Sequence, residues 1–288
     1  MAAEFIASYC ADWARAEPRF WTIPPSTHVE ELAINTAAAM TFAVAARIYG
    51  GKSATTIITR TKTETVLGVL LLCMFPLNAV NKFVLQSMTA GRVLLELCLL
   101  PCHVFTALAA LCALSTSSRT RTTAYNLLLY DSWMPLLAMA FPDLTSARAL
   151  ASPLLRNSSI ALFWLHHGLL FVTPFLLHWM AKQPKARFTP PRPAGAGLLQ
   201  YLAFVYAFIG VLLCAAALAT GRNLNYSLWP PTLPASVLAR LGGARYRATI
   251  GLFLAFVCGP LMRHVVISGV AALLGLALPH GRAKAKAG

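Results

Sequence analysis

Long blocks of apolar residues, separated by short polar segments, run through most of this sequence. Each block is close to the roughly 20 residues that a helix needs to cross the hydrocarbon core of a bilayer. The pattern predicts an all-α, polytopic integral membrane protein, a bundle of seven transmembrane helices. We expect the spans at residues 32–49, 65–85, 93–114, 124–141, 158–180, 198–219 and 248–278. The last span is long enough to tilt or to break near Gly259-Pro260.

This pattern divides the chain into a single membrane domain with two short ends. Residues 1–31 form a predicted N-terminal tail, 32–278 the seven-helix domain, and 279–288 a basic tail. The Pro-rich stretch 182–197 reads as a connector within the domain. We find no internal repeat, which disfavours a transporter built from inverted halves.

Composition supports the membrane assignment and limits the classes of molecule that the protein is expected to bind. The 288 residues are 58% hydrophobic and 11% charged, whereas a soluble domain carries about 25% charged residues. The net charge of +15 is spread over short loops, which favours anionic lipid headgroups over nucleic acid as the counterpart. The seven cysteines show neither zinc nor disulfide spacing, and we expect no metal or cofactor.

Basic residues also predict how the chain is oriented. The loops after the first, third and fifth spans, with the C-terminal tail, hold thirteen Lys and Arg, against ten on the opposite side. Because basic loops stay in the cytoplasm, we expect a lumenal N-terminus and a cytoplasmic C-terminus. No signal peptide is recognisable in residues 1–30. We expect the protein in the endoplasmic reticulum or another endomembrane.

Polar side chains inside apolar spans are the candidates for function. Each charged group at bilayer depth costs a few kcal/mol, roughly 2.5 to 3.5 on insertion scales. The candidates are Glu96, Cys102, His103, Asp131, His166, His167, His178, Arg263 and His264. Asp131 and Arg263 could neutralise each other across the bundle, and we expect Glu96 to pair with Arg92 and not with His103.

Cys102 and His167 stand out among these candidates. Each lies ten residues into its span, on two helices that run in the same direction, so both are about 15 Å from the same membrane face. A cysteine and a histidine at matched depth could form a nucleophile–base pair. The alternative is structural: a buried cysteine, a kink at Pro101, and paired histidines that bond between helices. Both readings stay open on spacing alone.

Three stretches together resemble the transmembrane protein 164 family. "LLPCHVFT" (99–106) is similar to its Pro-Cys-His motif. "FPDL" (141–144) and "FWLHHGLLFVTPF" (163–175) resemble its Phe-Pro segment and its His-bearing helix. "NLNYSLWPP" (223–231), "ARYRA" (244–248) and "GPLMR" (259–263) resemble its Asn-Leu-Asn loop, Tyr-Arg pair and late Gly-Pro-Leu. The ordered set covers about residues 95 to 265, and residues 1–90 match only as apolar helices.

The resemblance implies a membrane acyltransferase acting on lysophospholipids, notably ether-linked ones. It implies that Cys102 is the nucleophile and that His167, directly before Gly168, is the base, whereas His166 occupies a position that is glutamine in the family. The candidate substrate-binding residues are His103, His166, Asn223, Asn225, Tyr246 and Arg247. Asn-Tyr at 225–226 departs from the family's Asn-Asn, which bears on the choice of substrate.

Three alternatives to the acyltransferase remain. A lipid hydrolase would use the same Cys–His pair. A seven-helix receptor would need neither residue, but the sequence lacks Asp-Arg-Tyr after the third span and Asn-Pro-x-x-Tyr in the seventh. A lipid-binding or scaffolding protein would need no chemistry at all. For the acyltransferase we expect the partners to be the membrane and phospholipid and lysophospholipid substrates, with no nucleic acid.

Overall fold

The computed structural model describes residues 23–50, 57–85, 88, 90–181, 194–220, 235–240 and 245–273. This part of the chain is helical, and its only β-type pairing is an isolated bridge between Ile57 and Ser117. The all-α prediction is therefore confirmed.

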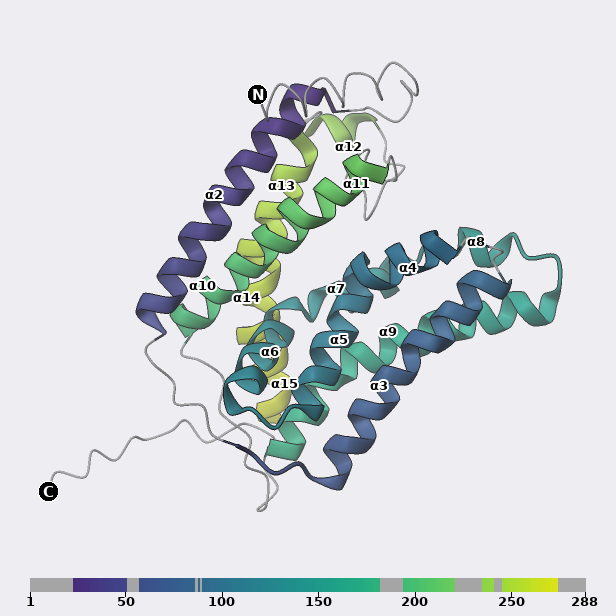
Figure 1. The fold of residues 1–288 in the computed structure, drawn as a ribbon, viewed down its shortest axis with the longest axis horizontal. Coiled ribbons are helices and arrows are strands. Elements are labelled where there is room, and N and C mark those ends of the chain that lie inside the picture. Colours follow the sequence, from purple (N-terminus) through teal and green to yellow (C-terminus); the bar gives the residue numbers. More distant parts are fainter. Residues whose placement is uncertain are drawn as a thin grey trace, which may run out of the picture.

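Figure 1 shows the helices of the described residues, coloured in chain order. The first half contains α2 (Pro25–Tyr49), α3 (Lys62–Val80), the π-helical turn η2 (Asn81–Leu85), α4 (Ala90–Leu99), α5 (Pro101–Leu114), α6 (Ser118–Asp131), α7 (Trp133–Ala140) and α8 (Thr145–Arg148). The second half contains α9 (Pro153–Ala181), α10 (Ala194–Val205), η3 (Tyr206–Leu213), α11 (Cys214–Thr220), α12 (Ala235–Arg240), α13 (Tyr246–Phe253), η6 (Leu254–Cys258), α14 (Gly259–Leu261), η7 (Met262–Ile267) and α15 (Ser268–Leu273).

Five continuous helices are long and apolar enough to cross a membrane. They cover residues 26–49, 62–84, 153–177, 194–220 and 246–270, and the bent pair α4 and α5 would make a sixth. The predicted count of seven is not reached in the described part of the chain. The stretch expected as the fourth span, 124–141, is divided at Ser132 between α6 and α7, and α6 carries Arg119 and Arg121 near its start.

The helix starts have clear local causes. Thr61 caps α3 in a capping box, in which its hydroxyl accepts from the Glu64 N–H while the Glu64 carboxylate accepts from the Thr61 N–H at 2.7 Å. Pro25 opens α2, a position where the missing N–H of proline costs nothing. The last predicted span does not separate at Gly259-Pro260. It continues through η6 and η7, whose wider turns absorb the proline.

Two groups of helices meet along α6 and α7. In Figure 1, α2, α10, α11 and α13 lie on one side, and α3, α4, α5 and α9 lie on the other. α6 packs against both α5 and α10, while α7 packs against α9. One apolar core joins α3, α5, α6 and α9, and a second joins α6 to α10. These contacts hold the Cys- and His-bearing helices together.

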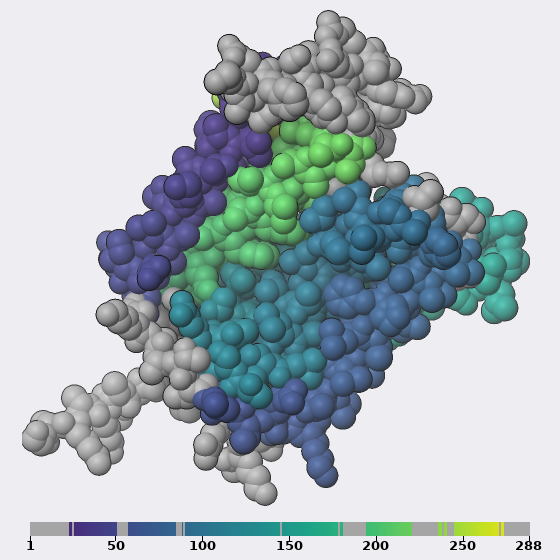
Figure 2. Space-filling view, in the orientation of Figure 1, coloured from purple at the N-terminus to yellow at the C-terminus, as the bar shows by residue number. Residues whose placement is uncertain are grey.

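The outer surface is apolar where lipid would lie. Side chains at the exposed positions of α2 and α3 include Met40, Val44, Val66 and Leu70, each 51% exposed or more. Figure 2 shows α2 and α3 flanking this face of the molecule. An exposed apolar surface of this extent marks an interaction site or a membrane-facing surface, which agrees with an integral membrane protein.

A buried ion pair links the start of α3 to α6. The Arg121 guanidinium donates to the Glu64 carboxylate, and the two side chains are 1% and 2% exposed. Removing one member of such a pair leaves the other charge buried. The pair therefore fixes how α3 and α6 meet at one end of the bundle.

We predict that Glu64→Gln lowers the free energy of unfolding by about 3 to 5 kcal/mol, the range for breaking a buried pair. Thermal unfolding of the detergent-purified protein measures this. Glu30→Gln is the control, because the Glu30–Arg245 pair is 3.5 Å long and mostly exposed. Equal melting temperatures for the two variants would contradict a stabilising role for the Glu64–Arg121 pair.

Candidate functional site

The helix carrying Cys102 is broken directly before it. α4 and α5 meet at Leu100 and are bent by 60°. Pro101 is the first residue of α5, where its fixed φ suits a helix start. Cys102 and His103 therefore occupy the first turn of α5. The prediction that Cys102 lies ten residues along one straight helix is therefore wrong. A proline can begin a new helix as readily as it can kink an existing one.

This position places the Cys102 side chain at the positive end of the α5 helix dipole. The half-buried thiol packs against the apolar core, in the first turn of α5. The N-terminus of a helix favours negative charge, and thiolates are stabilised there. The local geometry therefore suits a cysteine that reacts as an anion.

His166 joins α9 to α5 and α3. Its Nε2 lies 2.7 Å from the Thr106 hydroxyl oxygen, and that hydroxyl lies 2.7 Å from the Cys102 carbonyl oxygen. A carbonyl only accepts, so the single hydroxyl proton goes to Cys102, and His166 Nε2–H must donate to Thr106. The Asn78 amide nitrogen lies 3.5 Å from His166 Nδ1. Both imidazole nitrogens of His166 are thus engaged in positioning.

His167 is arranged differently. Its Nδ1 lies 2.9 Å from the Phe163 carbonyl oxygen of the preceding turn. Because that oxygen only accepts, Nδ1 carries the proton and Nε2 is the unprotonated, basic nitrogen. The side chain is 7% exposed, and its ring is 5.3 Å from that of His166. Of the two neighbouring histidines, His167 has the nitrogen suited to accept a proton.

His103 completes the histidine cluster. Its ring stacks on His166 with centroids 5.2 Å apart and lies 5.9 Å from Phe75. Its Nδ1 is buried and has no hydrogen-bond partner among the described residues. His103 also interacts electrostatically with His167. The Cys102–His167 pairing and the substrate-binding role of His103 and His166 stay predictions, since no contact with a substrate tests them.

The remaining substrate-binding candidates lie elsewhere. Asn223 and Asn225 fall outside the described residues. Tyr246 is buried at the start of α13. The Arg247 guanidinium is 2.5 Å from the Glu31 carboxylate and 3.3 Å from the Cys214 sulfur. Tyr246 and Arg247 thus belong to the contact of α13 with α2 and α11.

The predicted Asp131–Arg263 pair does not form. The Arg263 guanidinium donates to the Asn126 side-chain oxygen at 2.7 Å and lies 4.7 Å above the Tyr130 ring. Both Asp131 carboxyl oxygens are buried without a hydrogen-bond partner in the described part of the chain. Matched depth does not determine which way a helix faces, so depth alone could not identify the partner.

The Glu96–Arg92 pair, in contrast, is confirmed at 2.8 Å. Glu96 also binds the Lys82 ammonium, 2.5 Å away. Lys82 interacts electrostatically with Cys102, His103 and His166. Sequence reasoning missed Lys82 because a lysine at the end of a span is ordinary; the adjacent polar Asn78 and Asn81 were the available signal.

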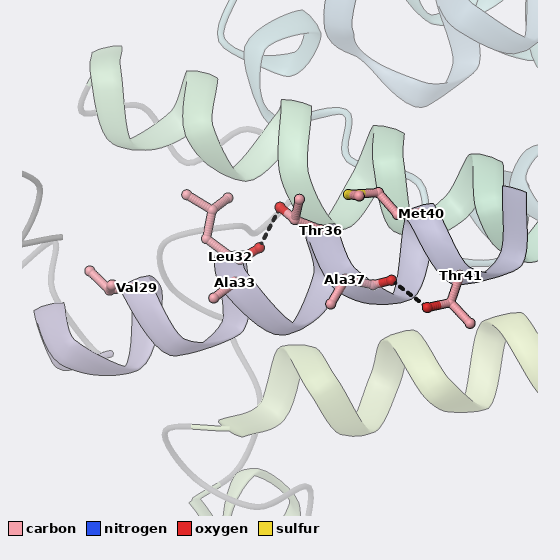
Figure 3. Close-up of a pocket in the computed structure, with 7 residues that line it drawn as sticks. All are labelled: Val29, Leu32, Ala33, Thr36, Ala37, Met40 and Thr41. Carbon is pink, nitrogen blue, oxygen red and sulfur yellow. Dashed lines mark hydrogen bonds between the residues drawn. The ribbon is translucent and has the colours of Figure 1, made fainter. Parts of the chain in front are cut away.

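A groove of about 570 Å³ runs along α2, away from the histidine cluster (Figure 3). Its two hydroxyl groups, on Thr36 and Thr41, bond back to carbonyls of their own helix, and its other lining side chains are apolar. It therefore offers space but no reactive group. Among the described residues, no three His, Cys, Asp or Glu side chains are grouped to hold a metal ion.

Comparison with known proteins gives one match. The sequence model of the TMEM164 family matches residues 25–262, a range that includes the broken helix, the histidine cluster and Arg247. No curated protein and no solved structure matches the chain.

We predict that Thr106→Val lowers the free energy of unfolding by about 1 to 3 kcal/mol, because it leaves the buried His166 N–H unpaired. Thermal unfolding in detergent measures the change. Thr173→Val is a matched control, since Thr173 is also buried and bonds its own helix, to the Leu169 carbonyl oxygen at 2.7 Å. If both variants lose the same stability, the Thr106–His166 bond contributes nothing.

Proposed function

The chain belongs to the TMEM164 family, and we propose that it is a membrane acyltransferase that moves a fatty acyl chain onto a lysophospholipid through a thioester on Cys102. The acceptor class includes ether-linked lysophospholipids. The observation that carries this proposal is the placement of Cys102 in the first turn of a helix that begins inside the bundle, next to a histidine cluster. The family match and the apolar helices support a lipid-facing site.

In the first half-reaction, His167 Nε2 removes the Cys102 thiol proton. The thiolate attacks the ester carbonyl carbon of a donor phospholipid, or the thioester carbonyl of an acyl-CoA. As the tetrahedral adduct collapses, the bond to the donor oxygen or sulfur breaks, and the protonated His167 returns its proton to that leaving group. The enzyme is left with an acyl group on the Cys102 sulfur.

In the second half-reaction, the acceptor hydroxyl replaces the leaving group. His167 Nε2 takes the proton of the lysophospholipid hydroxyl while its oxygen attacks the thioester carbonyl. The carbon–sulfur bond breaks, an ester forms, and the Cys102 thiolate regains its proton from His167. Donor and acceptor therefore exchange one acyl group, and the enzyme is unchanged.

Backbone donors near the cysteine suit the charge that develops in both steps. The oxyanion of each tetrahedral adduct forms at the N-terminus of α5, where the N–H of Cys102 lies in the first turn and the helix dipole favours negative charge. Fixed donors of this kind act most strongly where water is excluded. His103 stands next to them, with a buried Nδ1 that can bind the oxyanion or the substrate.

A lipid hydrolase is the second candidate, because it would form the same thioester. The two activities differ in whether water or a lysophospholipid hydroxyl reaches the acyl group. The half-buried state of Cys102 favours the lipid acceptor, which arrives from the bilayer. Exclusion of water then favours transfer over hydrolysis.

We also propose that α6 and α7 together cross the membrane once, as the fourth crossing in chain order, which brings the total to seven. α3 begins where α5 ends, since the Ile58 N–H donates to the Thr116 carbonyl at 2.7 Å. α9 begins where α3 ends, since Ser159 donates to the Asn81 side chain at 2.5 Å. The chain between α5 and α9 must therefore traverse the bundle. Seven crossings place the ends on opposite sides, with the C-terminus cytoplasmic in an endomembrane.

We predict that Cys102→Ala and His167→Ala each lower acyl transfer at least a hundredfold, because each removes a group that changes bonding or protonation; general base catalysis alone contributes about 10²- to 10⁴-fold. Purified protein in vesicles with a labelled donor phospholipid and a lysophospholipid acceptor gives the rate. Mass spectrometry gives the acyl adduct on Cys102.

His166→Gln is the matched control for His167→Ala. A glutamine amide can still donate to Thr106 and accept from Asn78, so this variant should keep most of the activity. Release of labelled fatty acid without transfer would instead identify a hydrolase. Full activity of Cys102→Ala would refute the thioester mechanism.

A further inference from the structure

Two cations and one carboxylate meet where α3 ends and α4 begins. Glu96 lies between Lys82 and Arg92, 2.5 Å from the ammonium and 2.8 Å from the guanidinium. One carboxylate balances only one of the two positive charges. The side chains of Lys82 and Arg92 are 15% and 41% exposed. Counted by themselves, these three side chains carry a net charge of +1, and they lie at a partly open surface.

This cluster adjoins the reactive cysteine. Glu96 lies on α4, the helix that ends at the break just before Cys102. Lys82 and Glu96 both interact electrostatically with Cys102, and Lys82 also does so with His103 and His166. No other described lysine interacts with Cys102 in this way. A ligand that binds the cluster with one end could therefore extend its other end toward Cys102.

Lys82 lies farther along the bundle than Cys102, as a phosphate lies farther from the bilayer centre than the ester carbonyls of the same phospholipid. Lys82 lies 20 residues beyond the start of α3, about 30 Å at 1.5 Å per residue. Cys102 lies 12 residues before the end of α5, about 18 Å by the same rise. Because the start of α3 and the end of α5 are joined by Arg60, whose guanidinium donates to the Leu114 carbonyl at 3.1 Å, both lengths start from one membrane face.

The hydrocarbon core is about 30 Å thick. For helices aligned with the membrane normal, Lys82 would therefore reach the opposite interface while Cys102 stays inside. In a glycerophospholipid, the phosphate lies at the interface and the ester carbonyls lie deeper, toward the acyl chains. The two lengths differ by about 12 Å. The lysine side chain and the glycerol unit of the lipid together span this distance. A phosphate at the cluster would place an ester carbonyl toward the thiol.

We infer that Lys82 and Arg92, oriented by Glu96, bind the phosphate of the glycerophospholipid whose acyl ester faces Cys102. This inference rests on the proposed acyl transfer for its purpose, but phosphate binding can be measured without it. The guanidinium fits two phosphate oxygens, and the ammonium adds a point charge. Glu96 keeps both cations at the mouth of the site when no lipid is bound.

The test measures binding to the full chain carrying Cys102→Ala, which cannot form a thioester. Two short-chain ligands with the same acyl groups are titrated by calorimetry: dihexanoyl phosphatidylcholine, which has the phosphate, and dihexanoylglycerol, which lacks it. Lys82→Gln and Arg92→Gln should each weaken binding of the phospholipid about tenfold or more, as expected for a lost charged hydrogen bond. Binding of dihexanoylglycerol should not change.

Two further variants separate a phosphate site from general damage. Lys82→Arg keeps the charge and should restore phospholipid binding. Arg119→Gln removes an exposed cation near the start of α6, at the other end of the bundle, and should have no effect. Equal weakening of both ligands by Lys82→Gln, or weakening of neither, would overturn the inference.

Coenzyme A distinguishes the source of the phosphate. Displacement of the phospholipid by coenzyme A, lost in Lys82→Gln, would assign the cluster to a soluble acyl donor and overturn the lipid assignment. Formation of the acyl adduct on Cys102 in the unsubstituted protein is measured separately. Its absence would refute the proposed acyl transfer and leave the phosphate-dependent binding as a result in its own right.

Discussion

The break between Leu100 and Pro101 is the constraint on which the arrangement of polar groups around Cys102 depends. A helix that starts within the bilayer leaves N–H groups without carbonyl partners, and lipid cannot bond them. Here Pro101 removes one such group, and the N–H groups of His103 and Val104 turn back to the Leu100 carbonyl at 2.9 and 3.1 Å. The N–H of Cys102 lies in the same first turn of α5. The break thus concentrates positive potential at the cysteine.

Polar side chains elsewhere in the bundle fix how its helices meet. Ser159 bonds Asn81 between α9 and the end of α3, and Asn126 bonds the Gly197 carbonyl at 2.9 Å between α6 and α10. Since lipid offers no competing partner, each bond favours one arrangement of two helices. A side chain on Gly197 would collide with Arg263 and Asn126, so that close approach depends on glycine. The site is held by contacts that lie outside it.

The sequence predicted the helical class, the approximate spans and the Glu96–Arg92 pair, because these depend on composition and on spacing along one helix. It did not predict the 60° bend, since proline is compatible with a kink or with a new helix. It paired Asp131 with Arg263 wrongly, because a count of residues gives depth and not the direction in which a side chain points. Lys82 joined the site only through packing of η2, which continues α3, against α4.

The two neighbouring histidines show how one helix can supply both a fixed support and a proton acceptor. Successive residues of an α-helix point about 100° apart, since 3.6 residues make one turn. His166 can therefore face Thr106, while His167 faces another direction and, among the described residues, bonds the Phe163 carbonyl alone, at 2.9 Å. A residue that donates to Thr106 needs no basicity, which explains why glutamine could serve there. The proton acceptor must keep a free nitrogen, and only the second position leaves one.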